Sequence, residues 1–106
     1  MSDIVIVLTT LGVDADVDAF ARTLVDERLA ACVNVLAPMT STYRWKGNIE
    51  RDTERQVVIK TTADRLDALQ ARVRQLHSYE VPEWLVLKID SGSEAYLDWL
   101  RIATGP

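Results

Sequence analysis

The segment His77–Glu83 concentrates the residues of this chain whose types suit ligand binding or proton transfer. It holds the one histidine of the sequence, followed by Tyr79, Glu80 and Glu83. Imidazole is a common metal ligand and proton-transfer group, whereas a histidine at a helix end also hydrogen-bonds free helix carbonyls. Two interpretations of His77 therefore stay open, a ligand-binding residue and a structural helix end.

Lys60 is a second candidate, because it interrupts the apolar run Val57–Ile59. A lysine inside a strand either extends its charge to solvent at an edge or pairs with a carboxylate in a cleft. Glu54, Glu80 and Glu83 are available as partners. The sequence favours neither interpretation.

The single cysteine, Cys32, begins a strand-like apolar run. A free cysteine in such surroundings is usually a small buried hydrophobic residue, and a thiolate metal ligand needs solvent access. One cysteine cannot form an internal disulfide. Together with the start Met1–Ile4, which has no basic segment typical of a signal peptide, this predicts a cytoplasmic protein.

The composition disfavours several classes of protein. A chain of 106 residues has room for one domain, expected to span residues 1–106. Twelve basic and sixteen acidic residues give a net charge of −4, and the bases are dispersed, so nucleic-acid binding is disfavoured. No apolar run approaches the roughly 20 residues that span a membrane. Phosphate-binding glycine loops, metal-spaced His or Cys clusters and nucleophile elbows are also absent, which predicts a protein without catalytic activity.

Hydrophobic periodicity predicts an α+β fold with the order βαββαβ and an extra C-terminal helix. The first helix is expected to begin among Asp14, Asp16 and Asp18 and to end near Ala31, and the second to begin at a capping box formed by Thr61–Asp64. The expected strands are Ile4–Leu8, Cys32 to Trp45, Glu54–Thr61 and Trp84–Ile89, and Tyr96, Trp99, Leu100 and Ala103 are expected to share one face of the last helix. Right-handed crossovers then place both main helices on one side of a ferredoxin-like sheet.

The second and third strands form an unusually long hairpin with a turn at Gly47. An arm from Val33 to Trp45 reaches roughly 43 Å, while a domain of this size is about 34 Å across. The hairpin must therefore bend, with Pro38 as the candidate position, or extend over a partner. Tyr43 and Trp45 on its projecting part are the expected interface residues, because aromatic side chains dominate interface burial. The acids of its second arm are expected to be solvated or to pair across the hairpin with Arg44 and Lys46; they are Glu50, Asp52 and Glu54.

Five motifs in order give this chain a resemblance to the CutA family of divalent-cation tolerance proteins. They are Leu29–Asn34, Ser41–Gly47, Ile59–Thr62, His77–Glu83 and Tyr96–Leu100. The resemblance implies a ferredoxin-like subunit, a homotrimer held by the long hairpins, an architecture like that of PII proteins, and a role in tolerance of copper and other divalent metals.

The resemblance also bears on a metal site. Copper-binding members use a cysteine at the end of the first strand and neighbouring histidines, but here Thr9 and Leu76 occupy those positions and His77 alone is kept. Ser78 replaces the usual proline. A site built from one imidazole and carboxylates would bind a divalent ion weakly, since copper prefers several nitrogen or sulfur donors.

Three hypotheses follow for the function. The first is a non-enzymatic, trimeric metal-tolerance protein that binds an ion or small ligand at clefts between subunits, with Lys60, His77, Tyr79, Glu80 and Glu83 as the cleft candidates. The second is a PII-like sensor that binds a small anionic metabolite and signals to a protein partner. The third is an enzyme that uses His77, Lys60 and Glu80 in a cleft.

Overall fold

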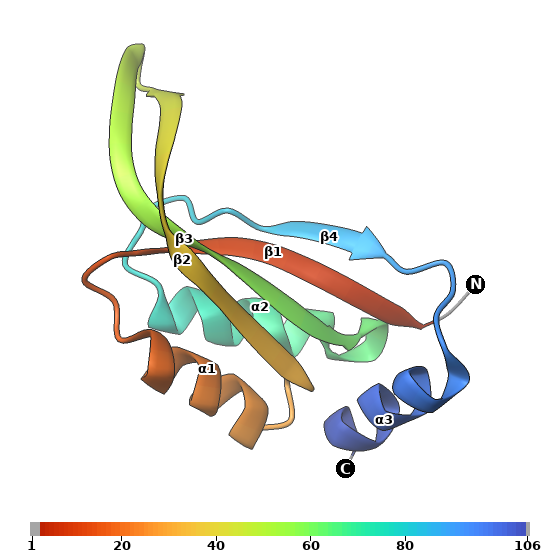
Figure 1. Cartoon of the computed structure of the whole chain (residues 1–106). Coiled ribbons are helices and arrows are strands. Elements are labelled where there is room, and N and C mark those ends of the chain that lie inside the picture. The colour runs from red at the N-terminus through yellow and green to blue at the C-terminus, as the bar shows by residue number, and fades with distance from the viewer. Residues whose placement is uncertain (1–2, 106) are drawn as a thin grey trace.

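A four-stranded antiparallel sheet with the strand order β2-β3-β1-β4 organises the chain (Figure 1). The computed structural model describes residues 3–105, and Met1, Ser2 and Pro106 lie outside this range. The elements are β1 Ile4–Gly12, α1 Val17–Asp26, β2 Cys32–Trp45, β3 Asn48–Thr62, the 3₁₀ turn η1 Ala63–Arg65, α2 Leu66–Leu76, β4 Leu85–Lys88 and α3 Glu94–Thr104. This order and topology confirm the predicted ferredoxin-like βαββαβ arrangement with an added helix.

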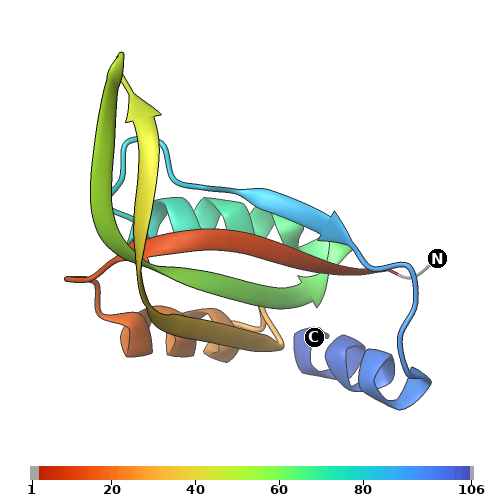
Figure 2. The ribbon, with the colours of Figure 1, turned by 45° about the horizontal axis from the view of Figure 1, so that its top comes forward.

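One face of the sheet is covered by α1 and α2, which lie side by side in both ribbon views (Figures 1 and 2). Val7 of β1 and Ile59 of β3 are fully buried against Leu24 of α1 and Leu69 of α2. Successive strand residues point to opposite faces, so the neighbouring residues point away from the helices. In β1, Ile6 and Leu8 are therefore on the face opposite Val7.

The opposite face of the sheet is covered at one end by α3. Leu100 packs there with Ile4 and Ala31. Of the four residues expected to share one face of α3, Leu100 and Ala103 pack against the sheet, whereas Tyr96 and Trp99 are 43% and 45% exposed. Leu97 and Thr104 complete the packed stripe, and the two aromatic rings contact each other beside it.

The first helix ends earlier than the sequence predicts, at Asp26 and not near Ala31. Arg28 adopts a left-handed backbone with φ 59°, and the next two amide groups donate to the carbonyl oxygen of Leu24. Glycine is the usual residue at such a helix end, so the sequence carries no signal for it. The Arg28 guanidinium donates to the carbonyls of Ile102 and Ala103, near the C-terminus of α3.

The predicted capping box before α2 is also wrong. The Thr61 hydroxyl donates to the carbonyl of Leu29 and not to the start of the helix. Thr62, which immediately precedes the 3₁₀ turn, makes no side-chain capping hydrogen bond either; its hydroxyl bonds to Asp64. The chain enters α2 through the 3₁₀ turn.

The hairpin of β2 and β3 projects beyond the rest of the molecule in both ribbon views (Figures 1 and 2), and the principal extents are 44 × 27 × 24 Å. An extra residue in β2 shifts the register between Val35 and Pro38, which confirms the predicted irregularity near Pro38. Lys46 and Gly47 both have positive φ, of 49° and 84°, as a two-residue hairpin turn requires. Within residues 3–105, no helix is long and apolar enough to cross a membrane.

Candidate functional site

His77 lies where the end of α2 meets the end of β1. Its Nε2 atom is 2.5 Å from the carbonyl oxygen of Thr10, and its Nδ1 accepts the Tyr79 amide hydrogen at 3.0 Å. A carbonyl accepts and an amide N–H donates, so this geometry places a hydrogen on Nε2 and leaves Nδ1 as an acceptor. Both nitrogens are therefore engaged, and a metal ion can bind either one only after a hydrogen bond is broken. The structural interpretation is right that His77 bonds a carbonyl, but this carbonyl belongs to β1 and not to the helix.

Gln56 is the centre of a second set of contacts in the same corner. Its Nε2 donates to the carbonyl oxygen of Thr9 at 2.6 Å and to Oε2 of Glu83 at 2.8 Å. These bonds fix the loop that leads from α2 to β4 onto the central strands. Sequence reasoning missed Gln56 as a site residue, although its polar side chain next to the apolar run Val57–Ile59 was a usable signal.

Tyr79 closes the corner on the side of the hairpin. Its hydroxyl donates to Oε2 of Glu54 at 3.1 Å, and its ring lies 4.6 Å from the His77 ring, centroid to centroid. Burial raises the pKa of Tyr79 to about 12, together with the hydrogen bond to Glu54 and the nearby negative charges. The hydroxyl therefore stays protonated at neutral pH and is a hydrogen-bond donor.

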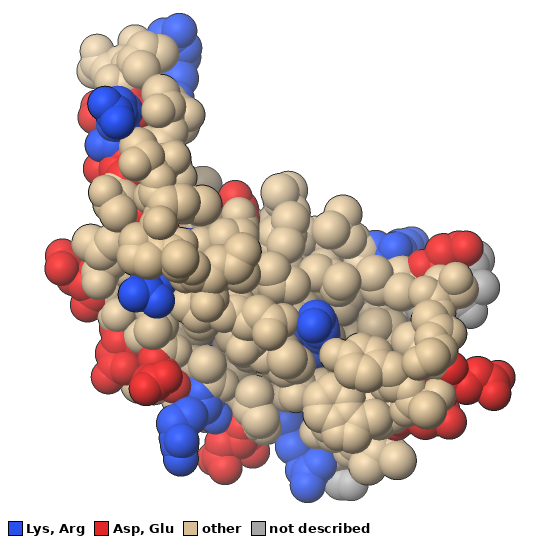
Figure 3. All heavy atoms as spheres, in the orientation of Figure 1, with Lys and Arg blue, Asp and Glu red and all other residues tan. Residues whose placement is uncertain are grey.

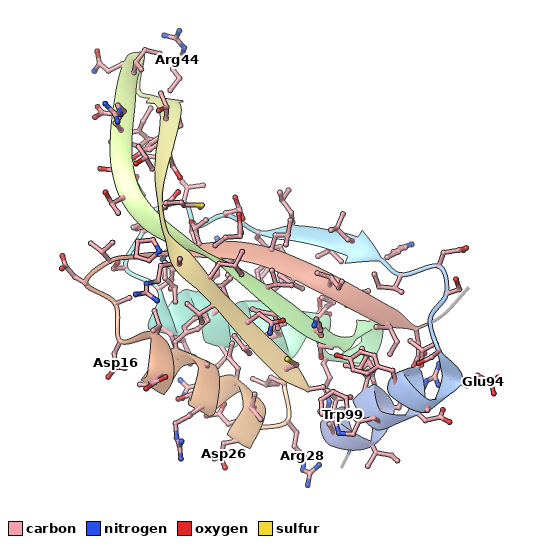
Figure 4. The ribbon with its side chains drawn as sticks, in the orientation of Figure 1. Asp16, Asp26, Arg28, Arg44, Glu94 and Trp99 are labelled. Atoms are coloured by element: carbon pink, nitrogen blue, oxygen red, sulfur yellow. The ribbon has the colours of Figure 1, made fainter. Side chains whose placement is uncertain are left out.

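A hollow of about 870 Å³ opens beside this corner. Its apolar lining includes Leu11 and Phe20, and its polar lining includes Tyr79 and three acids, Asp14, Asp16 and Asp52. Asp16 caps α1 by accepting the Ala19 amide hydrogen, and it stands at the start of that helix in Figure 4. An acidic hollow of this kind suits a cation better than an anion.

Two further cleft candidates, Lys60 and Glu80, do not contact His77 or Gln56. Lys60 is paired with Ile6 in the sheet, whereas Gln56 is paired with Thr10, so Lys60 lies four residues along β3 from the corner, or roughly 13 Å. No carboxylate lies within ion-pair distance of Lys60 among residues 3–105. Glu80 forms a loose contact of 3.8 Å with Lys46, and both side chains are mostly exposed.

Of the two alternatives for the hairpin acids, the solvated face holds for Glu50 and Asp52, which are exposed, and pairing with Arg44 and Lys46 is not observed among residues 3–105. Asp52 accepts a hydrogen bond from the Tyr43 hydroxyl, and Glu54 accepts one from Tyr79. Arg44 is opposite Ile49 in the register, so it lies on the other face of the hairpin from these acids. Tyrosine hydroxyls therefore replace the predicted cations.

Cys32 is half-buried, and its Sγ lies 3.8 Å from Oδ1 of Asn34. It is at the far end of the sheet from His77, because its register partner is Lys60. Within residues 3–105, no group of three or more His, Cys, Asp or Glu residues is placed to hold a metal ion.

The fold and this corner define a ferredoxin-like α+β protein with a projecting hairpin and a polar junction of strand, helix and loop. Comparisons with known proteins agree. The family model described as CutA1 divalent ion tolerance protein matches residues 5–103, and the chain belongs to this family.

Individual relatives are similar over most of the chain. The divalent-cation tolerance protein CutA of Thermus thermophilus is 45% identical over 100 residues, which cover 94% of this chain and 97% of that protein. The human protein CutA is 46% identical over 84 residues. This match covers 79% of this chain and 47% of the human protein, so it spans about half of that relative's length. The crystal structure of CutA from Xylella fastidiosa has a TM-score of 0.93 at 38% identity, covering 98% of this chain and 100% of that chain.

Proposed function

We propose that this chain forms a homotrimer and acts without catalysis in tolerance of divalent cations, with copper as the first candidate. The description of its family supports the tolerance role. The proposed ligand site is the corner of His77, Tyr79 and Glu83, completed by a neighbouring subunit. The compartment proposed is the cytoplasm, on the basis of the single cysteine of the sequence.

The observation that carries this proposal is the uncovered part of the sheet face opposite α1 and α2. Sheet pairing places Ile6 beside Leu87, and Leu8 beside both Leu85 and Val58. Leu85 and Leu87 are 55% and 49% exposed. In the view of Figure 3, the middle of the globular part is largely uncharged, with a few spots of Lys and Arg, and the acidic side chains lie mainly along its margins. Contiguous exposed apolar surface of this kind marks protein interfaces.

The projecting hairpin supports the same assembly. Tyr43 and Trp45 are 40% and 38% exposed, and Ile49 is 62% exposed. A two-stranded ribbon is marginal in water without further packing. A second copy that covers the hairpin and the open sheet face supplies that packing, and the length of the hairpin allows it to reach a neighbour.

The corner determines what kind of ion binding is proposed. Glu54 and Glu83 bring carboxylate oxygens to it, but His77 is fully hydrogen-bonded within its own subunit. Binding of an ion therefore requires further donors from the neighbouring subunit or release of the His77 ring. Both requirements predict a modest affinity for a divalent ion. The same is expected because Thr9 and Leu76 supply neither the sulfur nor the nitrogen donors that copper prefers.

The two other hypotheses have less support. A sensor of anionic metabolites needs basic groups around its pocket, and the hollow is lined by Asp14, Asp16 and Asp52. An enzyme based on His77, Lys60 and Glu80 needs these groups close together, and Lys60 lies about 13 Å along β3 from the corner.

Native mass spectrometry with and without Cu²⁺ and Zn²⁺ tests this proposal, because it reports subunit number and ion stoichiometry together. A trimer that takes up a whole number of ions per interface is the expected result. A stable monomer at micromolar concentration contradicts the proposed trimer. A trimer that binds neither ion contradicts the proposal that the protein binds a divalent cation. Thermal unfolding adds a second test, since the melting temperature of a coupled trimer rises with protein concentration.

A further inference from the structure

The last helix, α3, is attached to the rest of the subunit through a small apolar contact of its own. Its residue Leu100 is buried with Ile4 and Ala31, whereas the main core around Val7 and Leu24 is a separate cluster between the sheet and the helices α1 and α2. Both ribbon views show α3 apart from α1 and α2 (Figures 1 and 2). Residues 89–93, which join it to β4, form neither helix nor strand. Loss of the α3 contact would therefore leave the main core in place.

The C-terminal end of α3 is held by two arginines from distant parts of the chain. Arg28, just after α1, donates to the carbonyl oxygens of Ile102 and Ala103 at 3.4 and 3.3 Å. Arg65, in the 3₁₀ turn η1, donates from Nε to the carbonyl oxygen of Thr104 at 2.8 Å. The last carbonyls of a helix lack a regular helical partner, and positive charge near them is favourable. We call these two side chains the arginine clamp.

The backbone of Arg28 indicates that its side chain is what this position requires. Its φ is 59°, in the left-handed region that glycine adopts without steric cost and that other residues adopt at a cost. A glycine here would relax the backbone but would contact nothing in α3. Figure 4 shows the Arg28 side chain between the end of α1 and α3. The arginine therefore contributes through its contact with α3, and not through the end of α1.

The other attachments of α3 are weak. Arg101 forms an ion pair with Asp3 at 2.8 Å and another with Asp98 of the same helix, and all three side chains are exposed, so these pairs add little stability. On its outer side, Tyr96 and Trp99 are 43% and 45% exposed. The position of α3 thus depends mainly on one small apolar contact and on the arginine clamp.

We propose that α3 is a strap that opens from the sheet while the βαββαβ core stays folded, and that Arg28 and Arg65 set how often it opens. An isolated helix of this length, 11 residues, is marginal in water, so α3 is expected to unfold when it leaves the sheet. Residues 89–93 are the hinge. Every contact in this inference lies within one subunit, so it depends neither on the proposed trimer nor on the proposed ion.

Opening of the strap changes the surface of the sheet. Ile4, which packs against α3, is on the same face of β1 as Ile6 and Leu8, because side chains alternate along a strand. Leu87, the partner of Ile6 on β4, is already 49% exposed. Uncovering Ile4 extends this apolar strip to the end of the sheet. The strap therefore controls how much apolar surface this face presents.

Native-state hydrogen exchange, read by mass spectrometry, compares peptides from α3 with peptides from β1 and β3 at low urea concentrations. In the wild type, exchange in α3 should depend less on urea than exchange in the two strands, because local opening exposes less surface than global unfolding. Arg28→Gly should speed exchange in α3 by about tenfold, since it removes hydrogen bonds from a charged donor. Exchange in β1 and β3 should not become faster, because glycine suits the left-handed backbone.

Arg65→Met is the second variant, because it keeps an apolar side chain and removes the donor to Thr104. It should also speed exchange in α3 selectively. Arg72→Ala is the matched control. The Arg72 guanidinium bonds to Glu27 and so joins α2 to α1, and its loss should leave exchange in α3 at the wild-type rate. All proteins are measured at one concentration, because association alters apparent stability.

Three results would overturn the inference. If α3 and the central strands of the wild type open with the same free energy and the same urea dependence, α3 belongs to the cooperative core. An unchanged exchange rate of α3 in either arginine variant removes that arginine from the clamp. A parallel increase in α3, β1 and β3 means that the arginines stabilise the whole subunit and not the strap. None of these results changes the number of subunits or of bound ions, so they leave the proposed function standing.

Discussion

The Nε2 atom of His77 lies 2.5 Å from the carbonyl oxygen of Thr10, and this contact joins the end of α2 to the end of β1. The same ring accepts the amide hydrogen of Tyr79 on its other nitrogen. One side chain therefore connects the helix, the strand and the loop that leads to β4. The corner proposed as a ligand site is at the same time a structural junction.

Replacement of His77 by alanine should lower the free energy of unfolding by about 1–3 kcal/mol, because the Thr10 carbonyl and the Tyr79 amide both lose their partner. Urea denaturation at a fixed protein concentration measures the change. Ser78→Ala, at the exposed neighbouring position, is the control and should leave stability nearly unchanged. Equal effects of the two substitutions would show that the contacts of His77 add no stability.

Copper binding should be modest in the wild type and weaker in His77→Ala. Within one subunit, an ion has to compete with two hydrogen bonds of the imidazole, and Thr9 and Leu76 supply no soft donor. Isothermal titration calorimetry with Cu²⁺ compares the two proteins. Tight binding that the substitution leaves unchanged would remove His77 from the site and point to Cys32.

Thr9 and Thr61 provide a matched pair of fully buried threonines. The Thr61 hydroxyl donates to the carbonyl of Leu29 at 2.7 Å, whereas the Thr9 hydroxyl has no hydrogen-bond partner among the described residues. Thr61→Val should therefore cost about 1–3 kcal/mol, since it leaves a buried carbonyl without its donor. Thr9→Val should be neutral or stabilising. Denaturant unfolding of both variants checks the difference, and an equal loss at the two positions contradicts it.

Stability should fall at alkaline pH through Tyr79. Its pKa rises from 10.0 to about 12 in the folded protein, through burial and the hydrogen bond to Glu54. A raised pKa means that the stabilisation is fully present below pH 10 and is lost as the pH rises toward 12. Unfolding measured across this range should show a shallower decline for Tyr79→Phe. Tyr96→Phe, which removes a hydroxyl with no hydrogen bond in the described part of the chain, should keep the wild-type slope.

Trp45→Ala should weaken self-association by several kcal/mol, as the loss of a large interface aromatic does. Trp45 is 38% exposed on the projecting hairpin, where its own subunit leaves much of the ring uncovered. Analytical ultracentrifugation measures the shift in assembly. Val25→Ala changes an exposed apolar residue of α1 and serves as the control. An unchanged assembly of the Trp45 variant would mean that the hairpin does not carry the interface.

The sequence by itself determined the order of the elements and the hairpin turn. Strand alternation around Val57 and Ile59 and the helical spacing of Leu69 and Val73 are local patterns, and the same residues form the core. Gly47 indicated the turn because glycine adopts a positive φ without steric cost. Patterns of residues close together in the sequence were therefore sufficient to predict the fold class.

Only the tertiary structure decided the contacts between distant segments. α1 ends early because Arg28 takes a left-handed backbone, for which its residue type gives no signal, and its side chain meets the end of α3. Asp52 and Glu54 bond to tyrosines because the register places Arg44 on the opposite face. Lys60 and His77 are separated because they meet different parts of β1. Such partners are fixed by how the strands and helices pack, which no local pattern of residue types records.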